Sequence, residues 1–115
     1  MDNNLRGEIN KLHAHVCSGL ADPNRILILY TLKDKTYSVS DLAELLGLPQ
    51  PTTSRHLKVL RERGMVSAQR DGQSVYYTLA DERIIKALEL LRSFLSDNLR
   101  SQAELVSPVD ANANS

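Results

Sequence analysis

Hydrogen-bonding and cationic side chains gather in one stretch of the sequence, from Gln50 to Arg70. Its polar members are spaced as on the outer face of a helix: Gln50, Thr52, Ser54, Arg55, Lys58 and Glu62. The stretch holds five Arg and Lys residues against one acid, an excess of 5 − 1 = +4 in a chain whose formal net charge is zero. Amides, hydroxyls and cations on a helix can reach the base edges and phosphates of a DNA major groove. These residues therefore point to nucleic-acid binding.

A helix over about residues 50–63 must carry these side chains. Thr53, Leu57 and Leu60 recur at helical spacing and would face the interior, while Gly64 would end the helix. The helix start offers no side-chain cap, because Pro49 precedes it.

A shorter helix is predicted just before it. Ser38 followed three positions later by Asp41 has the form of a capping box, and the next residues up to Leu46 are largely apolar. Gly47 would end this helix. Two helices joined by a tight turn predict a helix-turn-helix, in which the second helix enters the major groove.

The pattern changes to a two-residue alternation after Gly64. Residues 65–69 and 74–79 are rich in strand-forming types, and Asp71-Gly72 between them is a hairpin-turn signal. Arg70 and Gln73 near the turn would lie along the flanking DNA backbone or minor groove. The hairpin at about 65–79 is the predicted wing. The expected fold class is mainly α with a small β-hairpin wing, a winged helix-turn-helix.

Long amphipathic helices are predicted at the two ends of the chain, from Asn4 to Ser18 and from Asp81 to about Gln102. Between the first of them and residue 33, Asp22-Pro23 is a strong start for a buried helix. The apolar stripes of the end helices exceed what so short a chain can cover by itself. We therefore expect a homodimer that buries Leu5, Ile9, Leu12, Leu88, Leu91, Leu95 and Leu99.

Composition bounds the remaining possibilities. The length predicts one domain over residues 1–106, and the polar segment 107–115 is expected to be a disordered tail. No apolar run could span a membrane and no signal peptide follows Met1, so a cytoplasmic protein is expected. The single Cys17 excludes an internal disulfide and fits a reducing compartment. No catalytic constellation is apparent, so we expect neither an enzyme nor a cofactor.

Four motifs in order resemble the ArsR/SmtB family of bacterial transcriptional repressors over roughly residues 5–100. They are Asp22-Pro23-Asn24-Arg25-Ile26-Leu27-Ile28-Leu29, Leu42-Ala43-Glu44-Leu45-Leu46-Gly47-Leu48, Gln50-Pro51-Thr52-Thr53-Ser54-Arg55-His56-Leu57-Lys58-Val59-Leu60-Arg61 and Arg70-Asp71-Gly72-Gln73-Ser74-Val75-Tyr76-Tyr77. The resemblance implies a homodimer, paired through its first and last helices, that represses an operator and releases it when an effector binds. Pro49 departs from the family, which often has a capping Ser there.

The family's usual sensing sites are altered in this sequence. Ser38 and Ser40 stand where soft-metal sensors have cysteines, and hydroxyls bind soft ions poorly. Arg83 and Phe94 fall on the two histidine positions of the zinc site on the last helix, and Tyr30 falls on a cysteine position of sulfur-responsive relatives. We therefore expect no metal site of the usual kind, and the effector is left unidentified.

The expected partner is an operator in double-stranded DNA, contacted by Gln50, Thr52, Ser54, Arg55, His56, Lys58, Arg70 and Gln73. His56 could instead be a packed histidine, because it adjoins the core position Leu57. One alternative is a metal or thiol sensor that uses His13 and Cys17, which lie four residues apart. Another is a protein-interaction module that has lost DNA binding. The basic outer face disfavours the latter, since protein interfaces favour aromatic anchors.

Overall fold

The computed structural model describes residues 2–105, so the predicted tail at 107–115 lies outside the described residues. The chain divides into two compact units, Met1–Glu82 and Arg83–Ser115. The first unit holds every element of the predicted helix-turn-helix and wing, and the described part of the second is a single helix. A single domain over residues 1–106 stays a prediction.

The N-terminal helix differs from the continuous α-helix predicted up to Ser18. Helix α1 spans Asn3–Lys11, with Asp2 as its N-cap, and continues as a π-helix, η1, over Leu12–Cys17. The Ser18 N–H donates to the carbonyl of His13, five residues earlier, at 3.0 Å. The predicted helix from Asn4 to Ser18 is confirmed in extent, but its last six residues have a π-helical register that was not predicted. Short π-helical insertions of this kind are rare and frequently mark functional sites.

Helices α2 and α3 begin where the capping signals place them, and α4 begins without a capping side chain. Helix α2 covers Pro23–Thr31, and the Asp22 carboxylate accepts from the Asn24 N–H at 2.8 Å. Helix α3 covers Val39–Leu46 and ends at Gly47, whose φ of 66° is the left-handed value that glycine adopts most readily. Helix α4 covers Gln50–Glu62, close to the predicted 50–63.

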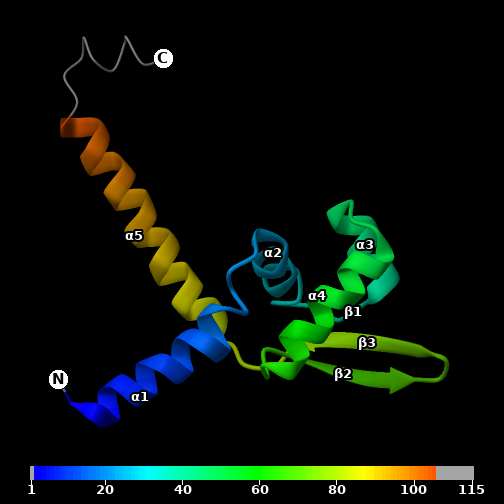
Figure 1. Cartoon of the computed structure of the whole chain (residues 1–115). Helices are drawn as coiled ribbons and strands as arrows, with labels where there is room; N and C mark the ends of the chain where they lie inside the picture. Colours follow the sequence, from blue (N-terminus) through cyan, green and yellow to red (C-terminus); the bar gives the residue numbers. More distant parts are fainter. Residues whose placement is uncertain (1, 106–115) are drawn as a thin grey trace. The chain divides into compact units, whose positions relative to one another are not determined.

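A three-stranded antiparallel sheet completes the first unit (Figure 1). Its order is β1-β3-β2, from Tyr37–Ser38, Ser74–Leu79 and Val66–Asp71 respectively. The predicted hairpin is confirmed, but Asp71 pairs with Ser74, so the turn itself is Gly72-Gln73. Gly72 has a φ of 65°, as two-residue hairpin turns require. Strand β1, which pairs with β3, was not predicted.

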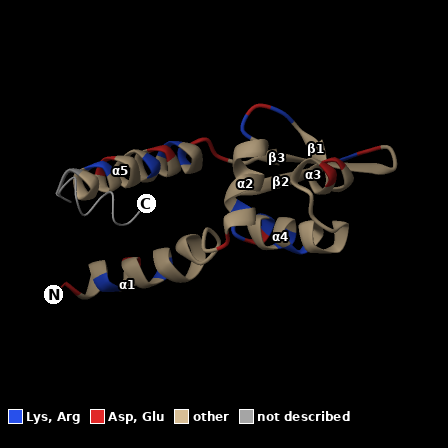
Figure 2. Cartoon of the chain, turned by 90° about the horizontal axis from the view of Figure 1, so that it is seen from above, with Lys and Arg blue, Asp and Glu red and all other residues tan. Residues whose placement is uncertain are grey.

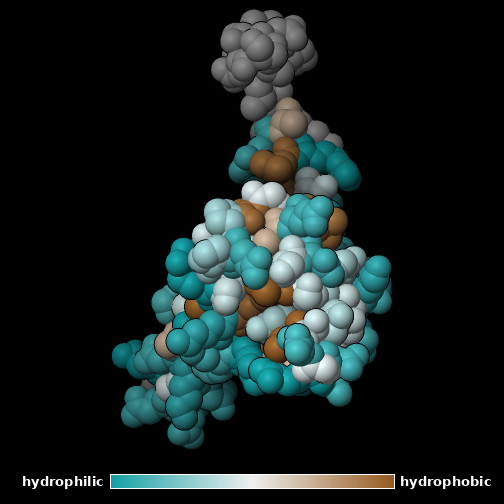
Figure 3. Space-filling view, turned by 90° about the vertical axis from the view of Figure 1, so that its right-hand side faces the viewer, coloured by the Kyte–Doolittle hydropathy of each residue, from teal (hydrophilic) through white to brown (hydrophobic). Residues whose placement is uncertain are grey.

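The core of the first unit fixes the inner face of α4. Leu57, Leu60 and Thr53 of this helix are fully buried, together with Ile28 and Leu29 of α2. The start of α4 has no capping side chain. The buried Thr53 hydroxyl donates to the Pro49 carbonyl at 3.1 Å, and this hydrogen bond joins the first turn of the helix to the residue before it. On the face drawn in Figure 3, hydrophobic residues are visible in small patches that hydrophilic residues surround.

Helix α5, Arg83–Leu105, is the longest described helix and makes up the described part of the second unit. Leu91, Leu95 and Leu99 are 59%, 55% and 55% exposed in the single chain. Leu88 differs, since it is only 5% exposed and offers little further area to a partner. Among the described residues, no helix is long and apolar enough to cross a membrane.

The cap of α3 gives a direct test of this local structure. The Ser38 hydroxyl accepts from the Asp41 N–H at 3.2 Å. Ser38→Ala should therefore lower the free energy of unfolding by about 1 kcal/mol, because a backbone donor at the helix start loses its partner. Urea unfolding would measure this. Ser40→Ala is the control, since Ser40 is the second residue of α3 and not its N-cap. Equal losses in the two variants would contradict the capping role.

Candidate DNA-binding surface

The outer face of α4 presents the hydrogen-bonding and cationic side chains that the sequence brings together. Gln50, Ser54, Arg55 and Lys58 are exposed, and Thr52 is half-buried. They are held there because the opposite side of the helix is anchored in the core, where α4 packs on α2, α3 and β2. The face is polar and carries cations, as a helix that enters a major groove must be.

Two hydrogen bonds link these side chains to their neighbours. Arg55 donates from Nη2 to the Thr52 hydroxyl at 3.3 Å, one turn earlier on α4. The Ser40 hydroxyl of α3 donates to the Gln50 amide oxygen at 3.4 Å, across the turn between the two helices. Both contacts are long and exposed, so they orient the side chains while leaving them open to another partner.

The hairpin adds one exposed cation to those of α4. Arg70 on β2 and Gln73 in the turn are both exposed. A side-chain hydrogen bond of 2.7 Å between Ser67 and Thr78 joins the two strands on their exposed side. Figure 2 shows Lys and Arg residues along α4, and at the hairpin one basic segment beside an acidic one. This distribution gives the surface a positive character although the whole chain is neutral.

His56 is not part of this outer face. Its side chain is 13% exposed and faces α2, where Nδ1 lies 3.4 Å from Arg25 Nη1 and Nε2 lies 4.0 Å from the Asp22 carboxylate. Of the two readings that the sequence left open, this placement favours the packed one. We therefore expect His56 to help position α4 and not to contact DNA.

Two arginines have contacts that sequence reasoning missed. Arg63, which follows α4, turns its guanidinium to the carbonyls of Ala14 and His15 in η1. Arg25 of α2 donates to the carbonyls of Ser18 and Gly19. Arg63 was part of the +4 excess, so one of the five cations that suggested DNA binding is engaged within the chain. Nothing in the local pattern separates these arginines from solvent-exposed ones.

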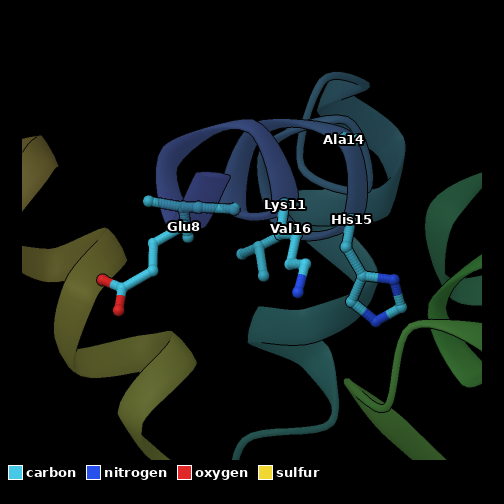
Figure 4. Close-up of a pocket in the computed structure, with 6 residues that line it drawn as sticks. Glu8, Lys11, Ala14, His15 and Val16 are labelled. Carbon is cyan, nitrogen blue, oxygen red and sulfur yellow. The ribbon is translucent and has the colours of Figure 1, made fainter. Parts of the chain in front are cut away.

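The remaining metal candidates do not form a ligand cluster in the single chain. His13 and Cys17 lie in η1 and are exposed, and no group of three or more His, Cys, Asp or Glu side chains suited to a metal occurs among the described residues. A hollow of about 670 Å³ lies along the same segment, lined by Glu8, Lys11, Leu12, Ala14, His15 and Val16. Figure 4 shows Glu8, Lys11 and His15 projecting from the same side of the segment.

Comparison with known proteins identifies close relatives of this architecture. Residues 22–68 match the model of the bacterial regulatory protein arsR family. The chain is 35% identical to the nodulation protein NolR of Rhizobium meliloti over 88 residues, which are 76% of this chain and 72% of NolR. It is 38% identical to the HTH-type transcriptional repressor SmtB of Mycobacterium tuberculosis over 77 residues, which are 67% of this chain and 57% of SmtB.

A solved structure supports the fold over most of the chain. The homodimeric winged helix-turn-helix DNA-binding domain of Mb0332 from Mycobacterium bovis aligns with a TM-score of 0.74 at 26% identity. The alignment covers 88% of this chain and 93% of that domain. The mainly helical fold with a small antiparallel sheet is thus that of a winged helix-turn-helix, as the sequence predicted.

Proposed function

Because the chain belongs to the ArsR family of bacterial regulatory proteins, we propose that it represses transcription as a homodimer that binds an operator in double-stranded DNA. Helix α4 would enter the major groove, with Gln50, Thr52, Ser54, Arg55 and Lys58 directed at bases and phosphates. Arg70 and Gln73 of the wing would lie on the flanking backbone. The regulatory role is supported by SmtB, a relative that is named a transcriptional repressor. The dimer is supported by the solved structure of the Mb0332 domain, which is homodimeric.

The observation that carries this proposal is the division of α4 into two faces. Three residues of its inner face, Thr53, Leu57 and Leu60, are fully buried, so the rotation of the helix about its axis is fixed. That rotation turns Arg55 and Lys58 outward. A helix held in this way can present its outer side chains to a groove without reordering, which reduces the entropic cost of binding.

The dimer would follow from the exposed apolar residues on the end helices. Leu5, Ile9 and Leu12 are 46%, 50% and 47% exposed, and the outward leucines of α5 are similar. Two recognition helices about 34–36 Å apart would read successive major grooves on one side of the duplex. The operator is therefore expected to be an imperfect palindrome.

Selection of duplexes from a randomised library by the purified protein tests this proposal. We expect enrichment of a two-fold-related sequence that binds at least about 1,000-fold more tightly than random DNA, as specific regulators do. Binding should weaken steeply with salt, because phosphate contacts release counterions. The absence of any enriched sequence would contradict sequence-specific repression.

Metal ions are expected to leave the complex with the selected duplex intact. Ser38 and Ser40 present hydroxyls where soft ions require thiolates, and the Ser38 hydroxyl already accepts the capping hydrogen bond of α3. At the other site of the family, Arg83 carries a permanent positive charge that would repel a divalent cation. Fluorescence anisotropy of the complex, titrated with zinc, cadmium and arsenite, measures the effect.

Substitutions in η1 and in the last helix distinguish the two places where a metal could still act. If a metal releases the protein from DNA, and Cys17→Ser or His13→Ala abolishes this release, the sensing site lies in η1. That result would support the alternative of a metal sensor that uses these two residues. Asp81 and Asp97 stand at the acidic positions of the zinc site that the family has on the last helix. Release that survives both changes, but disappears when Asp81 or Asp97 is replaced, would show that the last helix holds a metal after all.

A further inference from the structure

We propose that Arg63 is a positioning residue that ties the recognition helix to the π-helical segment η1, so that the geometry of η1 controls DNA affinity. The inference rests on the proposed DNA binding by α4, and adds a route by which the N-terminal helix acts on it. Two parts of the chain that are far apart in sequence meet at this point: η1 with the following loop from Ser18 to Asp22, and the end of α4.

Arg63 reaches three acceptors through one nitrogen, whose two N–H groups must share them. Its Nη1 donates to the carbonyls of Ala14 at 2.9 Å and His15 at 2.7 Å, and to the Ser18 hydroxyl at 2.6 Å. These contacts span 45 to 49 residues of sequence. We call this set of contacts the Arg63 bridge. Hydrogen bonds from a charged donor are roughly twice as strong as neutral ones, so the bridge is a firm link.

The π-helical register is what makes these carbonyls available. In an α-helix the Ser18 N–H would donate to Ala14, four residues earlier. Here it donates to His13, and the Ala14 carbonyl instead accepts from Arg63 Nη1 and from the Ser18 hydroxyl. The guanidinium thus replaces backbone donors that the shift of register removes. Straightening η1 into an α-helix would return these carbonyls to backbone donors and change their position relative to Arg63.

Gly19 provides the space through which Arg63 reaches η1. The residue is buried, and a Cβ atom at this position would lie 2.7 Å from Arg63 Cδ and 3.2 Å from Met65 Cε. Because the guanidinium beyond Cδ is fixed by the bridge, the side chain cannot move aside without losing its hydrogen bonds. Alanine at position 19 should therefore break the bridge while every charge of the protein stays in place.

Arg25 forms a second link between the same elements. Its Nε donates to the Gly19 carbonyl at 2.7 Å, its Nη2 donates to the Ser18 carbonyl at 3.0 Å, and its Nη1 lies 3.4 Å from His56 of α4. The loop after η1 is therefore held to the middle of α4 as well as to its end. A change in η1 would shift the loop and the recognition helix together.

The consequence concerns regulation. Helix α1 runs directly into η1 and carries the exposed Leu5 and Ile9 that we assign to the dimer contact. A rearrangement of α1, whether by dimerisation or by an effector, would reach α4 through the Arg63 bridge. The link needs no ligand at the DNA surface itself, because it acts on the position of the recognition helix.

Hydrogen exchange on the free protein tests the bridge without DNA. Arg63→Ala should raise amide exchange in the segments 12–20 and 56–64 together, since both lose the same contact. Arg61→Ala is the matched control, because Arg61 is an exposed arginine of the same helix end. Unchanged exchange in Arg63→Ala would overturn the bridge, whatever the protein binds.

The second arm measures affinity for the duplex selected by the wild-type dimer. We expect Gly19→Ala and Arg63→Ala each to weaken binding by about tenfold, and the double variant to be no weaker than either, because both remove one contact. Gly19 is buried and uncharged, so residue 19 makes no phosphate contact of its own. If Gly19→Ala does not fold, Ser18→Ala removes one acceptor of the bridge and takes its place.

The outcomes are distinguishable. Arg63→Ala could lower the affinity for DNA while Gly19→Ala keeps the wild-type affinity, or the losses could add in the double variant. Either result would make Arg63 a DNA contact and overturn the inference. Failure of the wild-type protein to select any duplex would refute the proposed function, while the exchange experiment would still decide whether the bridge exists.

Discussion

The double variant Arg55→Ala/Lys58→Ala is expected to bind the selected duplex at least about 100-fold more weakly than wild type. Both side chains are exposed on the outer face of α4, whose inner face is buried. A good bidentate base contact contributes about 1–3 kcal/mol, and each phosphate contact adds about 0.9 to the salt slope. Anisotropy at several salt concentrations measures affinity and slope together.

The single variants assign the two roles. A residue that contacts phosphate should lower the salt slope by about 1 when it is removed, whereas a residue that reads a base should relax specificity at one position. Lys33→Ala/Lys35→Ala is the control, because it removes the same charge from the exposed loop after α2. Unchanged affinity in the α4 variant, with the dimer intact, would overturn the assignment of the recognition helix.

The second large effect is expected at the dimer contact. Leu91→Glu/Leu95→Glu should raise the dissociation constant of the dimer by at least about 100-fold, since each leucine that is buried on association contributes roughly 1.5–3 kcal/mol. Both residues are more than half exposed in the single chain, at 59% and 55%, and glutamate is a good helix former. The protomer should therefore remain folded. Sedimentation velocity at micromolar concentration measures the association.

Leu45→Glu provides a matched control for this prediction. Leu45 of α3 is 59% exposed, as Leu91 is, but lies on a helix to which we assign no dimer contact. Its replacement should leave the dimer unchanged. A wild-type monomer, or equal behaviour of the α3 and α5 variants, would contradict dimerisation through α5.

Local capping chemistry explains why much of the fold could be predicted from the sequence. Asp22, Ser38 and Gly47 each act within a few residues, so their patterns mark the helix boundaries that the structure has. The outer face of α4 also follows from helical spacing alone. What these signals cannot give is a feature set by distant residues.

The π-helix, β1 and the environment of His56 are features of that second kind. The six residues of η1 show the same apolar spacing whether the register is α or π, and two of their carbonyls accept from Arg63, 48 and 49 residues away. Strand β1 has two residues and forms only because β3 lies beside it. His56 could not be assigned from its neighbours in sequence, because the groups that face it belong to α2.

Methylation protection on the selected duplex tests most directly whether α4 of a dimer enters the major groove. Guanine N7 lies in the major groove, where arginine and lysine reach it. We expect the wild-type protein to protect guanines in two patches on one face of the duplex, about 10–10.5 base pairs apart from centre to centre. Arg55→Ala/Lys58→Ala should lose this protection. Binding that leaves N7 fully reactive, or a single patch at saturation, would contradict a dimer that reads the major groove with α4.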